Sequence, residues 1–113
     1  NGKQTRDFTF VTDVANAFVA ASRNGKNGEV YCCGGTEHCA MIDLISDICG
    51  LMGKDPSKDI KIFQKARYFK EIEKQYIDST KLRNIGWDPK VPLDLGLKLT
   101  IDYYSDLAKK AKP

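Results

Sequence analysis

The chain has 113 residues, of which 42% are hydrophobic and 29% charged, so it is long enough for one small domain and not for two. Its net charge of +3 comes from scattered side chains, and we therefore expect no nucleic-acid partner. No apolar run approaches the ~20 residues that cross a bilayer, so we expect no membrane partner either.

The cysteines show none of the patterns of a secreted, disulfide-bonded protein, so we expect reduced thiols and a cytoplasmic protein. Three of them, Cys32, Cys33 and Cys39, lie near His38, and zinc takes thiolates and imidazole in tetrahedral sets. Neighbouring residues on a strand point to opposite faces, however, and no C-x-x-C pair is present. The sequence therefore predicts no metal site, with a zinc-binding module at these four residues as the alternative.

The first predicted elements are a strand and a helix. Residues 8–11 have the aromatic and β-branched composition of a strand. Thr12 or Asp13 offers a side-chain oxygen that could cap the helix that follows, which would end at Asn24-Gly25. This helix carries Val14, Ala15, Phe18 and Val19 on one apolar face.

The middle of the chain predicts two further strands with a helix between them. Residues 29–33 have the composition of a short strand that Gly34-Gly35 stops. A broad apolar stripe predicts a helix over residues 41–52, closed by Gly53. Residues 60–63 form the next predicted strand.

The last part of the chain begins with a charged loop over 65–74 and an extended segment over 75–77. Asp78-Ser79 would cap a short helix that ends at Gly86, and the final helix begins near Leu93. The predicted order is β-α-β-α-β-β-α-α. This order favours an α/β fold, α+β locally, in which about four helices cover a small sheet within one domain, residues 1–113.

Catalytic constellations are not visible in the sequence. Gly34-Gly35 lacks the spacing of a dinucleotide-binding loop, and no Ser sits in a nucleophile elbow. The single His38 has no acid-base partner that the sequence identifies. We therefore predict no catalytic residue in this chain.

Three charged residues are the candidates for ligand binding. Arg6 precedes the first predicted strand, where its guanidinium could fork onto a phosphate or form an ordinary ion pair with a carboxylate. Arg67 and Glu71 lie in the charged loop. Arg67 would suit a phosphate and Glu71 a ribose or sugar hydroxyl, although such a loop is also typical of a solvated surface.

Three stretches resemble family motifs in register. "NGKQTRDFTFVTDVANAF" resembles G-x-x-x-R-D-[FYW]-x-x-V-x-D-x-A-x-A, and "GEVYCCGG" is similar to G-E-x-[YF]-N-[VI]-G-x-G, with Cys32 in place of the Asn. "QYIDSTKLRNIGWDPKVPLDLGLKLTIDYY" looks like the D-x-[ST]-K and G-W-x-P ending of the same family. That family is the extended short-chain dehydrogenases acting on nucleotide sugars, and the resemblance covers nearly the whole chain.

The resemblance implies a nucleotide-sugar epimerase or dehydratase that uses NAD or NADP. Such enzymes have an N-terminal Rossmann domain and a smaller C-terminal domain that holds the nucleotide sugar, and this chain is similar to the C-terminal portion only. The dinucleotide loop and the catalytic Tyr-x-x-x-Lys pair are expected upstream of residue 1. We therefore expect the chain alone to bind no cofactor and to be inactive.

The resemblance also assigns expected roles to the three candidate residues. Arg6 matches the family Arg that contacts the substrate diphosphate. Arg67 falls near the second family Arg, and Glu71 near its acidic partner on the ribose, with an Arg-x-x-x-Glu spacing. The wording "KEIEKQYID" is closest to CDP-glucose 4,6-dehydratase-like members, and UDP-glucose 4-epimerase-like members are the other group considered.

Two alternatives to the enzyme portion remain. One is a free-standing binding or interaction module, with or without zinc at the four residues named above. The other is a structural fragment that associates with itself, because the apolar helix face at Val14 to Val19 would pack against the missing Rossmann domain. In both the second alternative and the main interpretation we expect a homodimer.

Overall fold

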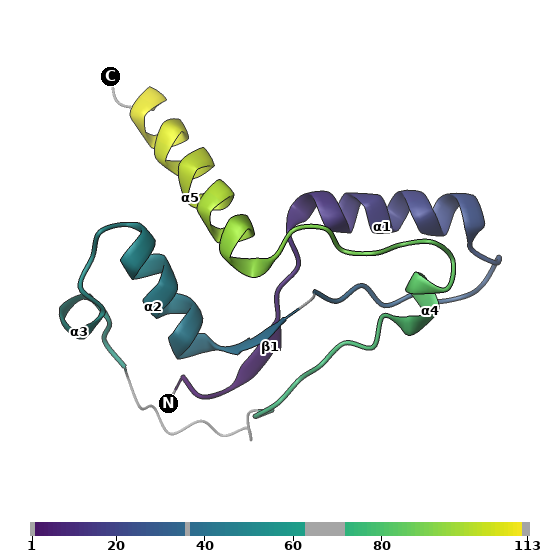
Figure 1. Cartoon of the computed structure of the whole chain (residues 1–113), viewed down its shortest axis with the longest axis horizontal. Helices are drawn as coiled ribbons and strands as arrows, with labels where there is room; N and C mark the ends of the chain where they lie inside the picture. Colours follow the sequence, from purple (N-terminus) through teal and green to yellow (C-terminus); the bar gives the residue numbers. More distant parts are fainter. Residues whose placement is uncertain (1, 36, 63–71, 112–113) are drawn as a thin grey trace.

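A small antiparallel sheet near the N-terminus organises the chain in the computed structural model, which describes residues 2–35, 37–62 and 72–111. Strand β1 spans Thr5–Asp7 and strand β2 spans His38–Ala40. They pair with Arg6 opposite Cys39 and Asp7 opposite His38. The short strands lie at the centre of the molecule, with helices on either side (Figure 1).

Five helices complete the described part of the chain, which confirms the predicted α/β class. The two long ones diverge in Figure 1, where α5 rises away from the body and α1 runs along its edge. The helices are α1 (Val11–Asn24), α2 (Met41–Leu51), α3 (Pro56–Asp59), α4 (Thr80–Arg83) and α5 (Leu93–Lys110).

Strand β1 has a neighbour on each side. On the side away from β2, Thr5 forms a parallel bridge with Lys74. The Thr5 N–H donates to the Glu73 carbonyl at 2.8 Å, and the Gln75 N–H donates to the Thr5 carbonyl at 3.3 Å. Residues 72–77 therefore lie alongside β1, as the predicted extended segment at 75–77 requires.

The first strand and the cap of the first helix were predicted wrongly. The strand lies at residues 5–7, and α1 begins at Val11, where residues 8–11 were expected to be extended. No side chain caps α1; the carbonyl of Phe10 accepts from the first turn instead. Asp13 is not a cap, because its carboxylate is committed to residues far along the chain.

The apolar face of α1 is not buried within the described part of the chain. The buried residues of the helix are Asp13 and Ala17, whereas Phe18 is 74% exposed and Val19 is exposed too. Ala17 packs inward because its small side chain admits the indole of Trp87 at close range. The large apolar side chains are left on the surface of this chain, which is unusual for a closed domain.

The core gathers between α1, α4 and the turn after α4. Leu82 is 1% exposed and Trp87 is 3% exposed, and both pack on Ala17. The indole N–H of Trp87 donates to the Asp13 carbonyl at 2.9 Å, which ties the turn after α4 to the first turn of α1. Gly86 precedes Trp87 and adopts the left-handed conformation, with φ of 97°, at the predicted end of the short helix.

Asp13 fastens the start of α1 to the segment that leads into α5. Its side chain is almost fully buried, and Oδ2 accepts from the backbone N–H groups of Lys90 at 3.0 Å and Val91 at 2.9 Å. Its place in the first turn of a helix favours negative charge. A buried carboxylate needs such partners, so these bonds fix the geometry of the junction between α1 and α5.

Two predicted strands do not pair within the described residues. Residues 29–33 form no strand, and Val30 is exposed. Residues 60–62 are also unpaired, and residue 63 lies outside the described part. Composition can predict that a segment is suited to a strand, but it does not show which other segment pairs with it.

Helix α2 was predicted correctly, with Gly53 in the left-handed conformation after its end. Its first N–H groups are satisfied by the chain itself, because Met41 donates to the Gln4 carbonyl and Ile42 to the Gly2 carbonyl.

No membrane-spanning helix is present among residues 2–35, 37–62 and 72–111. At α4, the predicted cap is confirmed for Asp78, whose Oδ1 accepts from the Thr80 N–H at 2.9 Å, whereas the Ser79 hydroxyl accepts from the Gly34 N–H at 2.8 Å.

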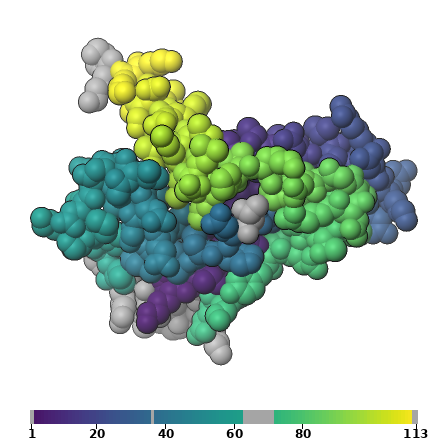
Figure 2. Space-filling view, viewed as in Figure 1, coloured from purple at the N-terminus to yellow at the C-terminus, as the bar shows by residue number. Residues whose placement is uncertain are grey.

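The chain exposes far more surface than its mass requires. Its accessible area is 8945 Å², whereas a compact monomer of 12.7 kDa exposes about 6200 Å². Its radius of gyration is 17.2 Å, against about 13 Å for a compact domain of this length. Figure 2 shows one reason, since α5 stands away from the rest of the molecule.

Candidate functional site

Arg6 lies in the middle of β1, between β2 and residues 72–77. Its guanidinium donates to the Thr5 carbonyl at 2.7 Å. No carboxylate among the described residues lies within ion-pair distance of it, so the ordinary ion pair considered from the sequence is not formed there. The side chain is half-buried and keeps guanidinium donors that a ligand could use.

Asp7 turns to the other side of the strand, and sequence reasoning gave it no role. Its side chain is 1% exposed, and Oδ1 accepts from Nδ1 of His38 on β2. Its second oxygen, Oδ2, accepts from the backbone N–H of Ile77. One carboxylate therefore ties β1 to both of its neighbours. The R-D motif was the available signal, but its partners lie 31 and 70 residues away.

Arg67 and Glu71, the other two predicted binding residues, lie outside the described residues. The structure therefore places neither of them relative to Arg6. The chain that follows them, residues 72–77, is described and lies against β1.

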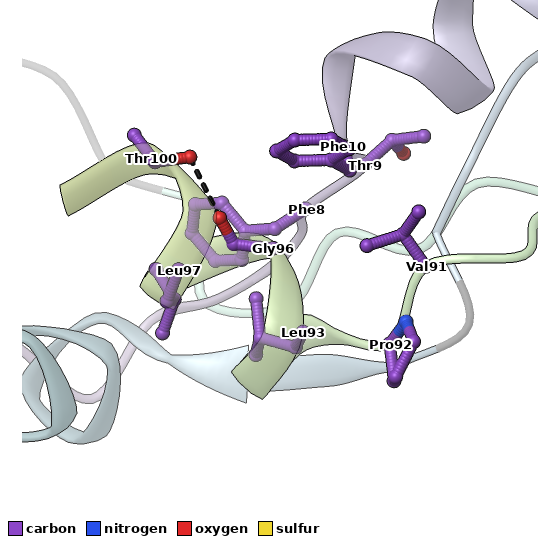
Figure 3. Close-up of a pocket in the computed structure, with 9 residues that line it drawn as sticks. All are labelled: Phe8, Thr9, Phe10, Val91, Pro92, Leu93, Gly96, Leu97 and Thr100. Carbon is purple, nitrogen blue, oxygen red and sulfur yellow. Dashed lines mark hydrogen bonds between the residues drawn. The ribbon is translucent and has the colours of Figure 1, made fainter. Parts of the chain in front are cut away.

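An apolar pocket of about 170 Å³ opens next to β1, between residues 8–10 and the first turns of α5 (Figure 3). The ring of Phe10 lies over Gly96, where an added Cβ would approach the ring to 3.2 Å. Thr100 turns its hydroxyl to the Gly96 carbonyl at 2.7 Å, so the wall offers little polarity. The pocket is lined by Phe8, Thr9, Phe10, Val91, Pro92, Leu93, Gly96, Leu97 and Thr100.

A wider groove of about 680 Å³ continues from this pocket between α1 and α5. Its walls are apolar and aromatic, and Tyr103 and Tyr104 are both mostly exposed. None of the described residues that line it is charged, so it suits the packing of another apolar surface better than a phosphate. The lining residues are Thr9, Phe10, Val11, Leu99, Thr100, Tyr103 and Tyr104.

The Cys/His cluster does not come together. His38 faces Asp7 and stacks on Tyr76 with ring centroids 4.4 Å apart, whereas Cys39 follows it on the same strand. No group of three or more His, Cys, Asp or Glu side chains in the described part of the chain could share a metal ion. Burial raises the pKa of the Cys33 and Cys39 thiols, which disfavours the thiolate that zinc needs.

The glycine pair of this chain lies against its own neighbours. An added Cβ on Gly35 would collide with the Phe8 carbonyl, and one on Gly34 would lie 2.8 Å from Cβ of Ile77. Both glycines therefore permit close packing that a larger residue would disrupt.

The arrangement is that of an α/β fragment of an extended short-chain dehydrogenase, with Arg6 on its first strand. Residues 1–100 match the family model described as GDP-mannose 4,6 dehydratase, and the chain belongs to that family. The resemblance seen in the sequence is thereby confirmed.

Curated relatives are much longer than this chain. The trifunctional UDP-glucose 4,6-dehydratase/UDP-4-keto-6-deoxy-D-glucose 3,5-epimerase/UDP-4-keto-L-rhamnose-reductase of Arabidopsis thaliana is 35% identical over 105 residues, which cover 93% of this chain and 15% of that protein. The human dTDP-D-glucose 4,6-dehydratase is 31% identical over 110 residues, covering 94% of this chain and 31% of the enzyme. The chain thus spans about a third or less of either relative.

Solved structures agree with the fold. The dTDP-glucose 4,6-dehydratase of Bacillus anthracis in complex with NAD superposes with a TM-score of 0.85 at 28% identity, over 96% of this chain and 34% of that one. The UDP-glucuronic acid 4-epimerase of Bacillus cereus, in complex with UDP-glucuronic acid and NAD, gives 0.80 at 34% identity, over 95% and 34%. Both relatives hold NAD, as the resemblance implied for enzymes of this class.

Proposed function

We propose that this chain is the nucleotide-sugar-binding part of an NAD(P)-dependent epimerase or dehydratase. The observation that carries the proposal is Arg6, a half-buried guanidinium on a strand fixed from both sides and without a carboxylate partner among the described residues. A guanidinium held in this way matches the diphosphate of a nucleotide sugar, because two N–H donors can fork onto phosphate oxygens.

Arg67 and Glu71 extend the same proposal. A second guanidinium would add positive charge for the diphosphate, and a carboxylate would accept from a ribose hydroxyl. The neighbouring segment 72–77 lies against the strand that bears Arg6, which supports their belonging to one site. The chain would then supply binding energy and orientation at the nucleotide end of the substrate, away from the reacting carbons.

The rest of the enzyme is proposed to cover the surface that this chain leaves open. The excess of about 2700 Å² over a compact monomer is larger than a standard one-sided interface, which is about 800 Å². Unpaired residues 29–33 and the exposed apolar side of α1 are the natural places for a Rossmann-type domain to pack. We propose a cytoplasmic homodimer for the complete enzyme, and no turnover by residues 1–113 alone.

Calorimetric titration of the complete parent protein tests the binding role. We expect UDP, dTDP, GDP or CDP to bind more tightly than the matching nucleoside, and Arg6→Met to weaken that diphosphate roughly 10- to 100-fold through loss of a charge-assisted hydrogen bond. Arg23→Met, at the exposed end of α1, is the matched control and should change nothing. Equal affinity of wild type and Arg6→Met for every diphosphate would refute the proposal.

A second assay tests the proposed inactivity. Purified residues 1–113 are mixed with NAD(P) and a panel of nucleotide sugars, and formation of reduced cofactor and of new sugar products is followed. We expect neither. Sustained turnover by this chain would show that its reactive groups lie within it and would overturn the proposal.

A further inference from the structure

Three separate segments of the chain meet at the carboxylate of Asp7. His38 on β2 donates to Oδ1, and the Ile77 N–H from the segment beside β1 donates to Oδ2. The carboxylate is 1% exposed, although the His38 side chain remains 45% exposed. Strand β1 is therefore fixed to both neighbours by one side chain as well as by its backbone bonds.

Burial makes this junction sensitive to its partners. A buried carboxylate costs free energy unless hydrogen bonds or a cation compensate for the lost water. Removing His38 would leave Oδ1 without its protein donor, so water or a shift of the strand would have to replace it. Tyr76 packs on the imidazole ring and holds it in place from the third segment.

Arg6 depends on this junction for its direction. Successive side chains of a strand point to opposite faces, so the rotation of β1 that buries Asp7 also sets where the Arg6 guanidinium emerges. Arg6 has no carboxylate of its own among the described residues to hold it, and it bonds only the neighbouring Thr5 carbonyl there. Its aim is thus set by the strand.

We propose that Asp7 and His38 form a positioning pair that aims Arg6 at the diphosphate of a nucleotide sugar. Neither residue touches the ligand. This inference rests on the proposed function and adds two residues to it. Bidentate binding of phosphate requires the guanidinium in a narrow range of positions, so a loosened strand weakens the diphosphate contact and leaves the rest of the ligand bound.

The test measures affinities of the complete parent protein for a nucleoside diphosphate and for its nucleoside. We expect His38→Ala to weaken the diphosphate roughly tenfold, as loss of a supporting hydrogen bond around a ligand-binding group does, and to leave the nucleoside unchanged. His38→Asn should restore the affinity, because its amide nitrogen is as many bonds from the backbone as Nδ1. Asp102→Asn, at an exposed position on α5, is the control.

A double-mutant cycle separates positioning from general loosening. In an Arg6→Met background, His38→Ala should cause no further loss of diphosphate affinity, because the group that it positions is gone. If His38→Ala fails to fold, the cycle is repeated with Asp7→Asn, alone and combined with Arg6→Met.

The outcomes distinguish the two proposals. A wild-type protein that binds no nucleoside diphosphate better than its nucleoside contradicts the proposed function itself. If Arg6→Met weakens binding but His38→Ala and Asp7→Asn do not, the positioning role alone is wrong. Additive losses in the cycle, or equal losses for nucleoside and diphosphate, also overturn it.

Discussion

The indole N–H of Trp87 donates to the backbone carbonyl of Asp13, 74 residues earlier in the chain, at 2.9 Å. The Asp13 carboxylate reaches in the same direction and accepts from the N–H groups of Lys90 and Val91. The first turn of α1 and the segment before α5 are therefore held by three hydrogen bonds through one residue.

Asp13 should accordingly be among the most sensitive positions for stability. Asp13→Ala leaves the partly buried backbone N–H groups of Lys90 and Val91 without their acceptor, and we expect a loss of about 2–3 kcal/mol in the free energy of unfolding. Asp13→Asn keeps one acceptor oxygen and should lose about half as much. Urea denaturation of the parent protein measures both. Asp102→Asn, whose side chain is exposed, should be neutral, and an equal effect at Asp102 would contradict the assignment.

Glycine substitutions test the close packing under Gly34 and Gly35. A Cβ on Gly35 would meet the carbonyl of Phe8, which belongs to backbone and cannot move aside cheaply. Gly35→Ala should therefore destabilise the protein by about 2 kcal/mol or more. The matched control is Gly50→Ala on α2, where nothing lies within 4 Å of the added atom and helix propensity should stabilise by up to about 1 kcal/mol. Thermal melts of the two variants should move in opposite directions.

The sequence predicted the long helices well, because periodicity and glycine stops are local. Helix α2 begins at the predicted residue, and Gly53 and Gly86 take the left-handed conformation expected of them. It predicted Thr12 or Asp13 as the cap of the first helix, and for Asp13 the prediction was wrong for a physical reason. A short polar side chain can form hydrogen bonds within its own helix or with a distant segment. The partners of Asp13 are Lys90 and Val91, which lie 77 and 78 positions further along the chain.

The apolar pattern of α1 shows a different limit. The pattern predicts that Phe18 and Val19 pack against an apolar surface, but it cannot say which polypeptide supplies that surface. In this chain the inward face is made of alanine and a buried carboxylate. The same holds for residues 29–33, whose composition predicts a strand and whose pairing partner is not in the described residues.

For the candidate site, the sequence predicted Arg6 but not the contact between Asp7 and His38. Asp7 was seen only as half of an Arg-Asp pair, and His38 only as a residue without a partner. Their contact spans two strands that are far apart in sequence, so no spacing rule could have joined them. Arg67 and Glu71 remain predictions.

Phe18→Ser tests whether another part of the parent enzyme covers α1. In isolated residues 1–113 the side chain is exposed, so we expect a change below about 0.5 kcal/mol in unfolding free energy, together with weaker self-association. In the parent protein we expect a loss of about 3–4 kcal/mol, as for other buried Phe truncations. Urea denaturation and sedimentation of both proteins measure this. Thr12→Ser, also exposed on α1, is the control, and a neutral Phe18→Ser in the parent would show that the face stays open.

Thiol alkylation should follow the environments of the cysteines. Burial raises the pKa of Cys39, and the carboxylates of Asp43 and Asp47 raise it further. Burial also raises the pKa of Cys33, whereas Cys32 is exposed. Because the thiolate is the reactive form, a raised pKa lowers the thiolate fraction at any given pH.

In residues 1–113, iodoacetamide at neutral pH should therefore modify Cys32 first, and the rate at Cys39 should keep rising to a more alkaline pH than for free cysteine. Peptide mass spectrometry over a pH series measures the order. The chain unfolded in urea is the control, since all rates should converge once burial and neighbouring carboxylates are lost. If Cys39 were alkylated fastest at neutral pH in the folded chain, the thiol could not be held protonated by its buried, acidic surroundings.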